Sequence, residues 1–198
     1  MHGLFTISFM KNFIIFILLV LGVSAYGQDA PINPEYIDAL KKLKNEATDT
    51  LSAEYFYNRA GIKYDFGNYT GSIEDSDRAH KLNPSSPKVL YNRGLSKLEL
   101  RQYRDARDDF SAAIKIDPKM VSAYNNRAIC KYLLKKYQAA IDDCNKAIEI
   151  DPKYAFAYHN RGLAEIELGL INNACEDFKI SYKLGDERSL KALEKFCQ

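Results

Sequence analysis

The sequence has 198 residues, of which 46% are apolar, a content typical of a folded chain rather than a disordered one. It carries 28 Lys and Arg residues against 26 Asp and Glu residues. A balance this close gives no long-range field that would attract nucleic acid or an anionic membrane, so neither is expected as a partner.

The first 27 residues are predicted to be a secretory signal peptide. Lys11 precedes an apolar run, Phe13–Val23, which has the length of a signal core and is too short to span a bilayer comfortably. Ala25 and Gly27 are the small residues expected before a cleavage site. Met10 could be the true start, and the alternative to a cleaved signal is an uncleaved anchor helix. We therefore expect an exported protein, periplasmic or secreted, with no membrane span after cleavage.

Residues 28–52 are predicted to form a linker and one capping helix. Asn33 and Pro34 are a typical N-cap and first-turn pair. An apolar stripe follows at helical spacing: Ile37, Leu40, Leu43, Ala47 and Leu51. This stripe does not match the repeat that follows it. We expect the helix to cover the exposed face of the first repeat.

From Ala53 onward the sequence repeats itself every 34 residues, and the clearest marker is the dipeptide Asn-Arg, at Asn58-Arg59, Asn92-Arg93, Asn126-Arg127 and Asn160-Arg161. Aromatic, small and apolar positions recur in the same register: Phe56, Leu90, Tyr124 and Tyr158; Ala60, Gly94, Ala128 and Gly162; Tyr69, Tyr103, Tyr137 and Ile171; Ser76, Phe110, Cys144 and Phe178. Each unit is predicted to contain two packed helices.

The third unit illustrates the expected helix ends. Its first helix is predicted from about Ser122 to Leu134 and its second from Tyr137 to Ile150, where Asp-Pro ends the helix. Gly67 and Gly169 are expected to supply a positive-φ residue at the turn between the helices of the first and fourth units.

This order of residues at this spacing resembles the tetratricopeptide repeat. The resemblance implies an all-α fold, a right-handed α-solenoid of four helix-turn-helix units with a capping helix at each end. The expected units are 53–86, 87–120, 121–154 and 155–186, and the C-terminal capping helix is expected at 187–198. The first unit departs from the family pattern at Ser72 and Ser76, and the fourth unit departs at Ser181 and lacks the closing Pro.

A spacing that recurs in all four units also predicts an ion pair in every unit. An Asp follows each Arg of the Asn-Arg dipeptide by sixteen residues, at Asp75, Asp109, Asp143 and Asp177. We predict part-buried, charge-assisted pairs. The alternative is a row of Arg side chains that grips an acidic ligand.

In tetratricopeptide arrays the first helix of each unit lines the concave wall, so the resemblance implies that the Asn row faces a groove. An amide donates and accepts at once, and a row of amides can hold a peptide backbone. The predicted partner-binding residues are Tyr57, Asn58, Tyr91, Asn92, Asn125, Asn126, Ile129, Tyr132, His159 and Asn160. The alternative is that the Asn side chains pack neighbouring first helices together.

Some members of the family clamp the C-terminal carboxylate of heat-shock chaperones with Lys, Asn and Arg side chains. The matching positions here are Tyr57, Gly61, Asn92, Ser122 and Asn126, and only Asn92 fits. We therefore do not expect this function.

The four cysteines suggest one disulfide. Cys175 begins the second helix of the fourth unit and Cys197 ends the capping helix, which should run antiparallel beside it, so these two can pair. Cys144 is expected to be a buried thiol, which Cys130 could approach. No metal-ligand spacing, phosphate loop or nucleophile motif occurs, so the sequence predicts no metal, no cofactor and no catalytic residue.

Two classes of function remain. The first is a non-catalytic scaffold that holds an extended or helical segment of a protein partner in its groove. The second is a structural subunit of a cell-envelope or secretion assembly, which would use its convex or end surfaces. A weaker option beside these two classes is an accessory protein that presents substrate to a hydrolase.

Overall fold

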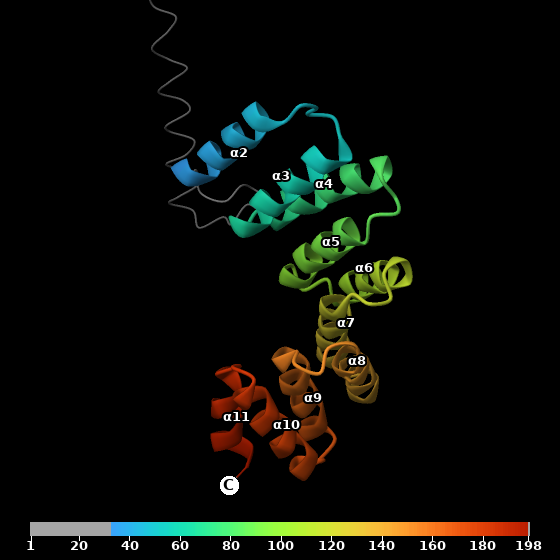
Figure 1. The fold of residues 1–198 in the computed structure, drawn as a ribbon, viewed down its shortest axis with the longest axis vertical. Helices are drawn as coiled ribbons and strands as arrows, with labels where there is room; N and C mark the ends of the chain where they lie inside the picture. The colour runs from blue at the N-terminus through green and yellow to red at the C-terminus, as the bar shows by residue number, and fades with distance from the viewer. Residues whose placement is uncertain (1–32, 198) are drawn as a thin grey trace, which may run out of the picture. The chain divides into compact units, whose positions relative to one another are not determined.

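The computed structural model describes residues 33–197, so the predicted signal peptide and the start of the linker lie outside the described residues. This part of the chain forms ten helices and no strand (Figure 1). The fold is therefore all-α, an α-solenoid of paired helices.

The helices follow the 34-residue period. The capping helix is α2 (Pro34–Glu46). The A helices, which come first in each unit, are α3 (Ala53–Asp65), α5 (Pro87–Glu99), α7 (Val121–Leu133) and α9 (Ala155–Glu167). The B helices, which come second, are α4 (Tyr69–Leu82), α6 (Tyr103–Ile116), α8 (Tyr137–Ile150) and α10 (Ile171–Lys183). The last helix is α11 (Arg188–Phe196).

The capping helix α2 begins at a side-chain cap and ends earlier than predicted. Asn33 Oδ1 accepts a hydrogen bond of 2.8 Å from the backbone N–H of Glu35, as its N-cap position predicts. The apolar stripe of α2 was predicted too long, because α2 ends at Glu46 and Ala47 is extended. Leu51 consequently lies beyond the helix and is 72% exposed.

A residue of positive φ joins the two helices of every unit. The φ angles are 78° at Gly67 and 74° at Gly169, as predicted, and 59° at both Arg101 and Lys135. These four positions recur at the 34-residue period. The turn therefore has one backbone conformation in all units, although only two units have a glycine there.

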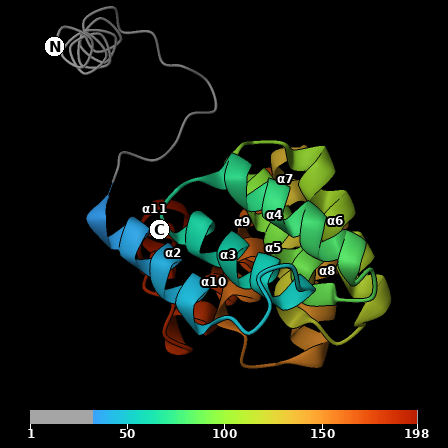
Figure 2. The ribbon, with the colours of Figure 1, turned by 90° about the horizontal axis from the view of Figure 1, so that it is seen from above.

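The stacking of the units curves the array. Within residues 33–197, each A helix contacts its own B helix and the A helix of the next unit, whereas successive B helices make no contact with each other. The A helices consequently lie closer together and form the inner, concave side. Figure 2 gives the view at right angles to Figure 1. The last helix, α11, packs against α9 and α10, where the A helix of a further unit would lie.

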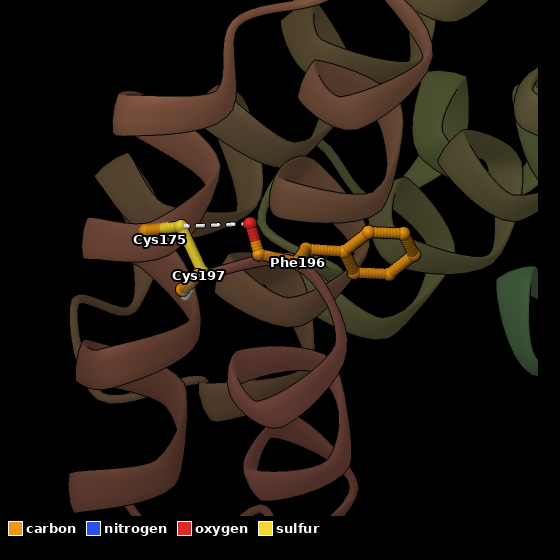
Figure 3. The surroundings of a disulfide bond; sticks show 3 residues. All are labelled: Cys175, Phe196 and Cys197. Carbon is orange, nitrogen blue, oxygen red and sulfur yellow. Dashed lines mark hydrogen bonds between the residues drawn. A yellow bond between two sulfur atoms is a disulfide. The ribbon is translucent and has the colours of Figure 1, made fainter.

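A disulfide fixes the C-terminal end of the array. Cys175 on α10 is bonded to Cys197 after α11, with the Cα atoms 5.7 Å apart (Figure 3). The ring of Phe196 also stacks on Phe178, with ring centroids 6.4 Å apart. The thiols of Cys130 and Cys144 are both buried and unpaired with each other. The disulfide therefore holds the last helix against the fourth unit.

Candidate functional site

The Arg–Asp pair is present in all four units. In each unit the Arg donates two hydrogen bonds, from Nε and Nη2, to the two carboxylate oxygens of the Asp. The donor–acceptor distances are 2.6 and 2.6 Å for Arg59–Asp75, 2.9 and 2.6 Å for Arg93–Asp109, 2.9 and 2.7 Å for Arg127–Asp143, and 2.6 and 2.7 Å for Arg161–Asp177. All four Asp side chains are buried. The bidentate geometry links the A and B helices of each unit.

The same Arg side chains also tie neighbouring units together. Nη1 of the second, third and fourth Arg donates to the B helix of the preceding unit, at Asp77 (2.6 Å), Ser111 (3.2 Å) and Asn145 (2.6 Å). These guanidinium groups are therefore engaged within the fold. The hypothesis that the Arg row grips an acidic ligand is not supported by this geometry, because little donor capacity remains.

A lysine adds a second positive charge to the pair in three units. Nζ of Lys63, Lys97 and Lys131 lies 3.0, 2.6 and 2.7 Å from the Asp carboxylate of its own unit. Burial raises the pKa of Asp75, but hydrogen bonds from Arg59 and Lys63 outweigh burial and hold that pKa below its usual value. This lysine stands four residues after the Arg in the first three units, a spacing that the prediction of the ion pair did not use.

The Asn row makes contacts between neighbouring A helices. Asn126 Nδ2 donates a hydrogen bond of 2.8 Å to the hydroxyl of Tyr91, and Asn160 Nδ2 donates one of 2.7 Å to Asn125 Oδ1. In contrast, the Asn58 side chain at the start of the array is exposed. The amides of the last two units therefore contribute to packing between A helices, which was the alternative explanation of the row.

Two residues predicted to line the groove are buried instead. Asn125 is 4% exposed, and its oxygen is occupied by Asn160. His159 is 8% exposed, and its Nδ1 lies 2.8 Å from Ser189 Oγ on α11. Burial, and then the charge of Arg188, lower the pKa of His159, so the imidazole is neutral near pH 7. Asn125 is therefore directed at the neighbouring A helix, whereas His159 contacts α11 and exposes only a small part of its surface on the inner side.

The inner side of the array holds a pocket at its C-terminal end, formed by α7, α9 and the start of α11. This C-terminal pocket measures about 270 Å³. Its lining combines apolar and polar side chains: Ile129, Tyr132, Leu133, His159, Asn160, Leu163 and Arg188. Four of these are predicted site residues, namely Ile129, Tyr132, His159 and Asn160. Leu133, Leu163 and Arg188 are additions that depend on how the units stack.

Arg188 is held in place at the edge of the C-terminal pocket. Its Nε and Nη2 donate hydrogen bonds of 2.8 and 2.7 Å to the carboxylate of Asp186. Its guanidinium carbon lies 4.9 Å from the ring centroid of Phe156. The pocket therefore has apolar walls and a fixed positive group at one edge, an arrangement suited to an apolar side chain of a partner.

A second pocket, of about 260 Å³, lies between the first two units. This N-terminal pocket contains Tyr57 and Asn58 and reaches Lys88 and Val89 on α5. Tyr91 and Asn92 lie outside the lining of both pockets. Six of the ten predicted residues thus line two separate pockets, and the other four, Tyr91, Asn92, Asn125 and Asn126, line neither.

Two features of residues 33–197 bear on other classes of site. No helix in this range is long and apolar enough to cross a membrane. Within the same range, no group of three His, Cys, Asp or Glu residues is arranged to hold a metal ion.

Comparison with known proteins identifies the repeats. Residues 87–120 and 121–154 each match the sequence profile described as tetratricopeptide repeat. No curated protein matches the chain. A crystal structure of MamA aligns with a TM-score of 0.70 at 22% identity, over 79% of this chain and 92% of that one.

Two further solved structures have the same fold. YrrB, described as a TPR protein with an unusual peptide-binding site, aligns with a TM-score of 0.68 at 17% identity, over 82% of this chain and 84% of that one. The first TPR of Spaghetti (RPAP3), bound to an HSP90 peptide, aligns with a TM-score of 0.59 at 20% identity, over 61% of this chain and 96% of that one. The chain therefore contains tetratricopeptide repeats, and its paired helices have the architecture of tetratricopeptide proteins.

Proposed function

We propose that this protein is a non-catalytic scaffold that binds a segment of a protein partner on its concave side, with the C-terminal pocket as the anchoring point. The observation that supports this most strongly is the lining of that pocket. Ile129, Leu133 and Leu163 offer an apolar floor of about side-chain size, and Arg188 and Asn160 border it. An extended or helical segment can place one apolar side chain there.

The other solved tetratricopeptide structures support this proposal at the level of the fold. One is described as having a peptide-binding site and another is bound to a peptide. This chain does not have the residues of an HSP90-type carboxylate clamp. That clamp requires basic residues at the positions occupied here by Tyr57 and Ser122. We therefore propose an apolar anchor rather than a carboxylate anchor.

The test is capture of partners from the exported fraction by the purified mature protein, followed by mass spectrometry. Leu133→Ser changes a pocket residue that is 41% exposed, so it should weaken capture without unfolding the protein. Ile180→Ser on α10 is the matched control, because Ile180 is 39% exposed and lies on a B helix away from the pocket. Capture that survives Leu133→Ser would contradict the proposal.

The same pair of variants tests the second candidate, a structural subunit of an envelope or secretion assembly. That candidate is favoured by the exposed apolar residues at the end of α10, where Ile180, Tyr182 and Leu184 are 39%, 44% and 38% exposed. If Ile180→Ser abolishes capture and Leu133→Ser does not, the partner contacts this end surface instead.

We also propose that the protein is exported, with cleavage after Gly27. The disulfide between Cys175 and Cys197 supports this location, because such bonds persist in oxidising compartments. The apolar run Phe13–Val23 supplies the signal core. N-terminal sequencing of the protein recovered outside the cytoplasm should begin at Gln28. An intact N-terminus in a membrane fraction would indicate an uncleaved anchor instead.

A further inference from the structure

The fourth unit differs from the other three in the charge beside its Arg–Asp pair. Lys63, Lys97 and Lys131 each place Nζ next to the buried Asp of their unit, and the corresponding residue of the fourth unit is Glu165. The 34-residue period would place two cations beside Asp177, an Arg and a Lys. Only the Arg is present, and Arg161 donates two hydrogen bonds to Asp177. A second carboxyl group takes the place of the lysine.

The Glu165 side chain lies in an enclosed, negatively charged environment. Glu165 is 7% exposed and Asp177 is 4% exposed. Within the described part of the chain, Glu165 Oε2 is buried without a hydrogen-bond partner. An ionised carboxylate would leave this buried oxygen without a donor, which costs free energy that the charge of Arg161 offsets only in part.

The groups that face Glu165 come from three helices. Asp177 and Glu176 on α10 are negative, and Arg161 on α9 itself is the positive group, already paired with Asp177. On α8 the facing group is the buried thiol of Cys144, whose pKa is raised by burial and by neighbouring carboxylates. The other two helices packed on α9 contact different residues: Tyr132 of α7 bonds to Glu167, and Ser189 of α11 bonds to His159.

We infer that Glu165 is a proton-binding position, which stabilises the fourth unit when protonated and loosens the packing of α9 on α10 when ionised. A protonated Glu165 can donate a hydrogen bond to the Asp177 carboxylate, which satisfies both groups and removes their repulsion. Burial, and then the Asp177 charge, raise the pKa of Glu165 to about 7. The site therefore titrates near neutral pH.

The direction of the pH effect follows from this shift. The folded protein holds the Glu165 proton up to about pH 7, whereas the ordinary pKa of the group is 4.5. Between these values the folded state binds more protons than the unfolded state, so stability falls as pH rises through this window. His159 acts in the opposite direction, because its lowered pKa favours the folded state as pH rises. Only a comparison with a Glu165 variant separates the two.

Ionisation of Glu165 should also affect the concave side, because α9 carries Asn160 and Leu163 of the C-terminal pocket. Alkaline conditions should therefore loosen the same helix that forms one wall of that pocket. This inference concerns the free protein and does not depend on the proposed function.

The experiment compares the melting temperatures of the wild type, Glu165→Gln and Glu165→Lys from about pH 5 to about pH 8. Glu165→Gln mimics the protonated side chain, so the two proteins should melt alike at the acidic end, and the wild type should melt several degrees lower at the alkaline end. Glu165→Lys restores the charge found in the other units and should melt highest at the alkaline end. Glu167→Gln, an exposed change on the same helix, is the control and should follow the wild type.

Two further measurements locate the effect. Carbon NMR of the side-chain carboxyl groups should show one resonance that titrates near pH 7 in the wild type and is missing in Glu165→Gln. Hydrogen exchange should accelerate with pH in α9 and α10, beyond the intrinsic rate, while α5 and α6 keep their protection. A melting-temperature difference between wild type and Glu165→Gln that stays constant across the range, or a Glu165 carboxyl that titrates near its ordinary pKa, would overturn the inference.

Discussion

Gly94 lies against the aromatic ring of Phe110, so that a methyl group on its Cα would come within 2.7 Å of Phe110 Cε1. Gly162 and Phe178 have the same relationship in the fourth unit, also at 2.7 Å. In the first and third units the small residue is Ala, and its partner on the B helix is Ser76 or Cys144. A Gly on the A helix thus faces a large Phe ring, and an Ala faces a smaller Ser or Cys. The two helices therefore keep one packing arrangement in all four units.

Gly94→Ala should destabilise the protein by about 1–3 kcal/mol, because the fully buried ring of Phe110 has no free space to move into. Chemical denaturation measures this directly. Gly61→Ala is the control: it also adds a methyl group to an A helix, but nothing lies within 4 Å of that position. That variant should gain up to about 1 kcal/mol from helix propensity. Equal effects of the two substitutions would show that the close approach has no energetic weight.

Lys135→Gly should stabilise the protein by about 1 kcal/mol, since Lys135 holds a φ of 59° that costs a side-chain-bearing residue energy and a glycine almost none. Arg101→Gly should behave in the same way. The converse substitution, Gly169→Ala, should destabilise by a similar amount through the backbone alone, because no atom lies within 4 Å of the added methyl group. Thermal melting of the three variants decides the matter, and a loss of stability in Lys135→Gly would contradict this account.

Asp143→Ala should cost about 3 kcal/mol, because it leaves two part-buried cations, Arg127 and Lys131, without their shared partner. The neighbouring Asp142 is exposed, so Asp142→Ala serves as the control and should change stability by less than about 1 kcal/mol. Denaturant titration of both variants would refute a structural role for the pair if their midpoints coincide.

Replacing both Cys175 and Cys197 by Ser should lower stability by about 3 kcal/mol, since the bond closes a loop of 22 residues in the unfolded chain. Hydrogen exchange should show α11 opening first, because the disulfide is the covalent link that ties the end of this terminal helix to α10. A reducing agent should reproduce the loss in the wild type and leave the double variant unchanged. If the reducing agent has no effect on the wild type, the bond does not contribute to stability.

The period of 34 residues was enough to predict the contacts that form within a unit. Arg127 and Asp143 lie sixteen residues apart on two helices joined by a short turn, so their pairing depends only on helix geometry and on that turn. The helix ends at Tyr137 and Ile150 and the positive φ at Gly67 followed in the same way. Local spacing determines these features because few conformations connect two adjacent helices.

Apart from the Cys175–Cys197 bond, the particular contacts between units could not be predicted from the spacing, since they depend on the rotation from one unit to the next. Nothing in the spacing indicated that Asn125 would be buried against Asn160, or that Leu51 would lie beyond the end of its helix. The sequence alone shows that Glu165 takes the place of the lysine found in the other units. Only its burial beside Asp177 raises its pKa. The sequence thus determined the repeats and their internal ion pairs, whereas the tertiary structure decided which side chains remain free on the concave side, because stacking covers some of them and leaves others exposed.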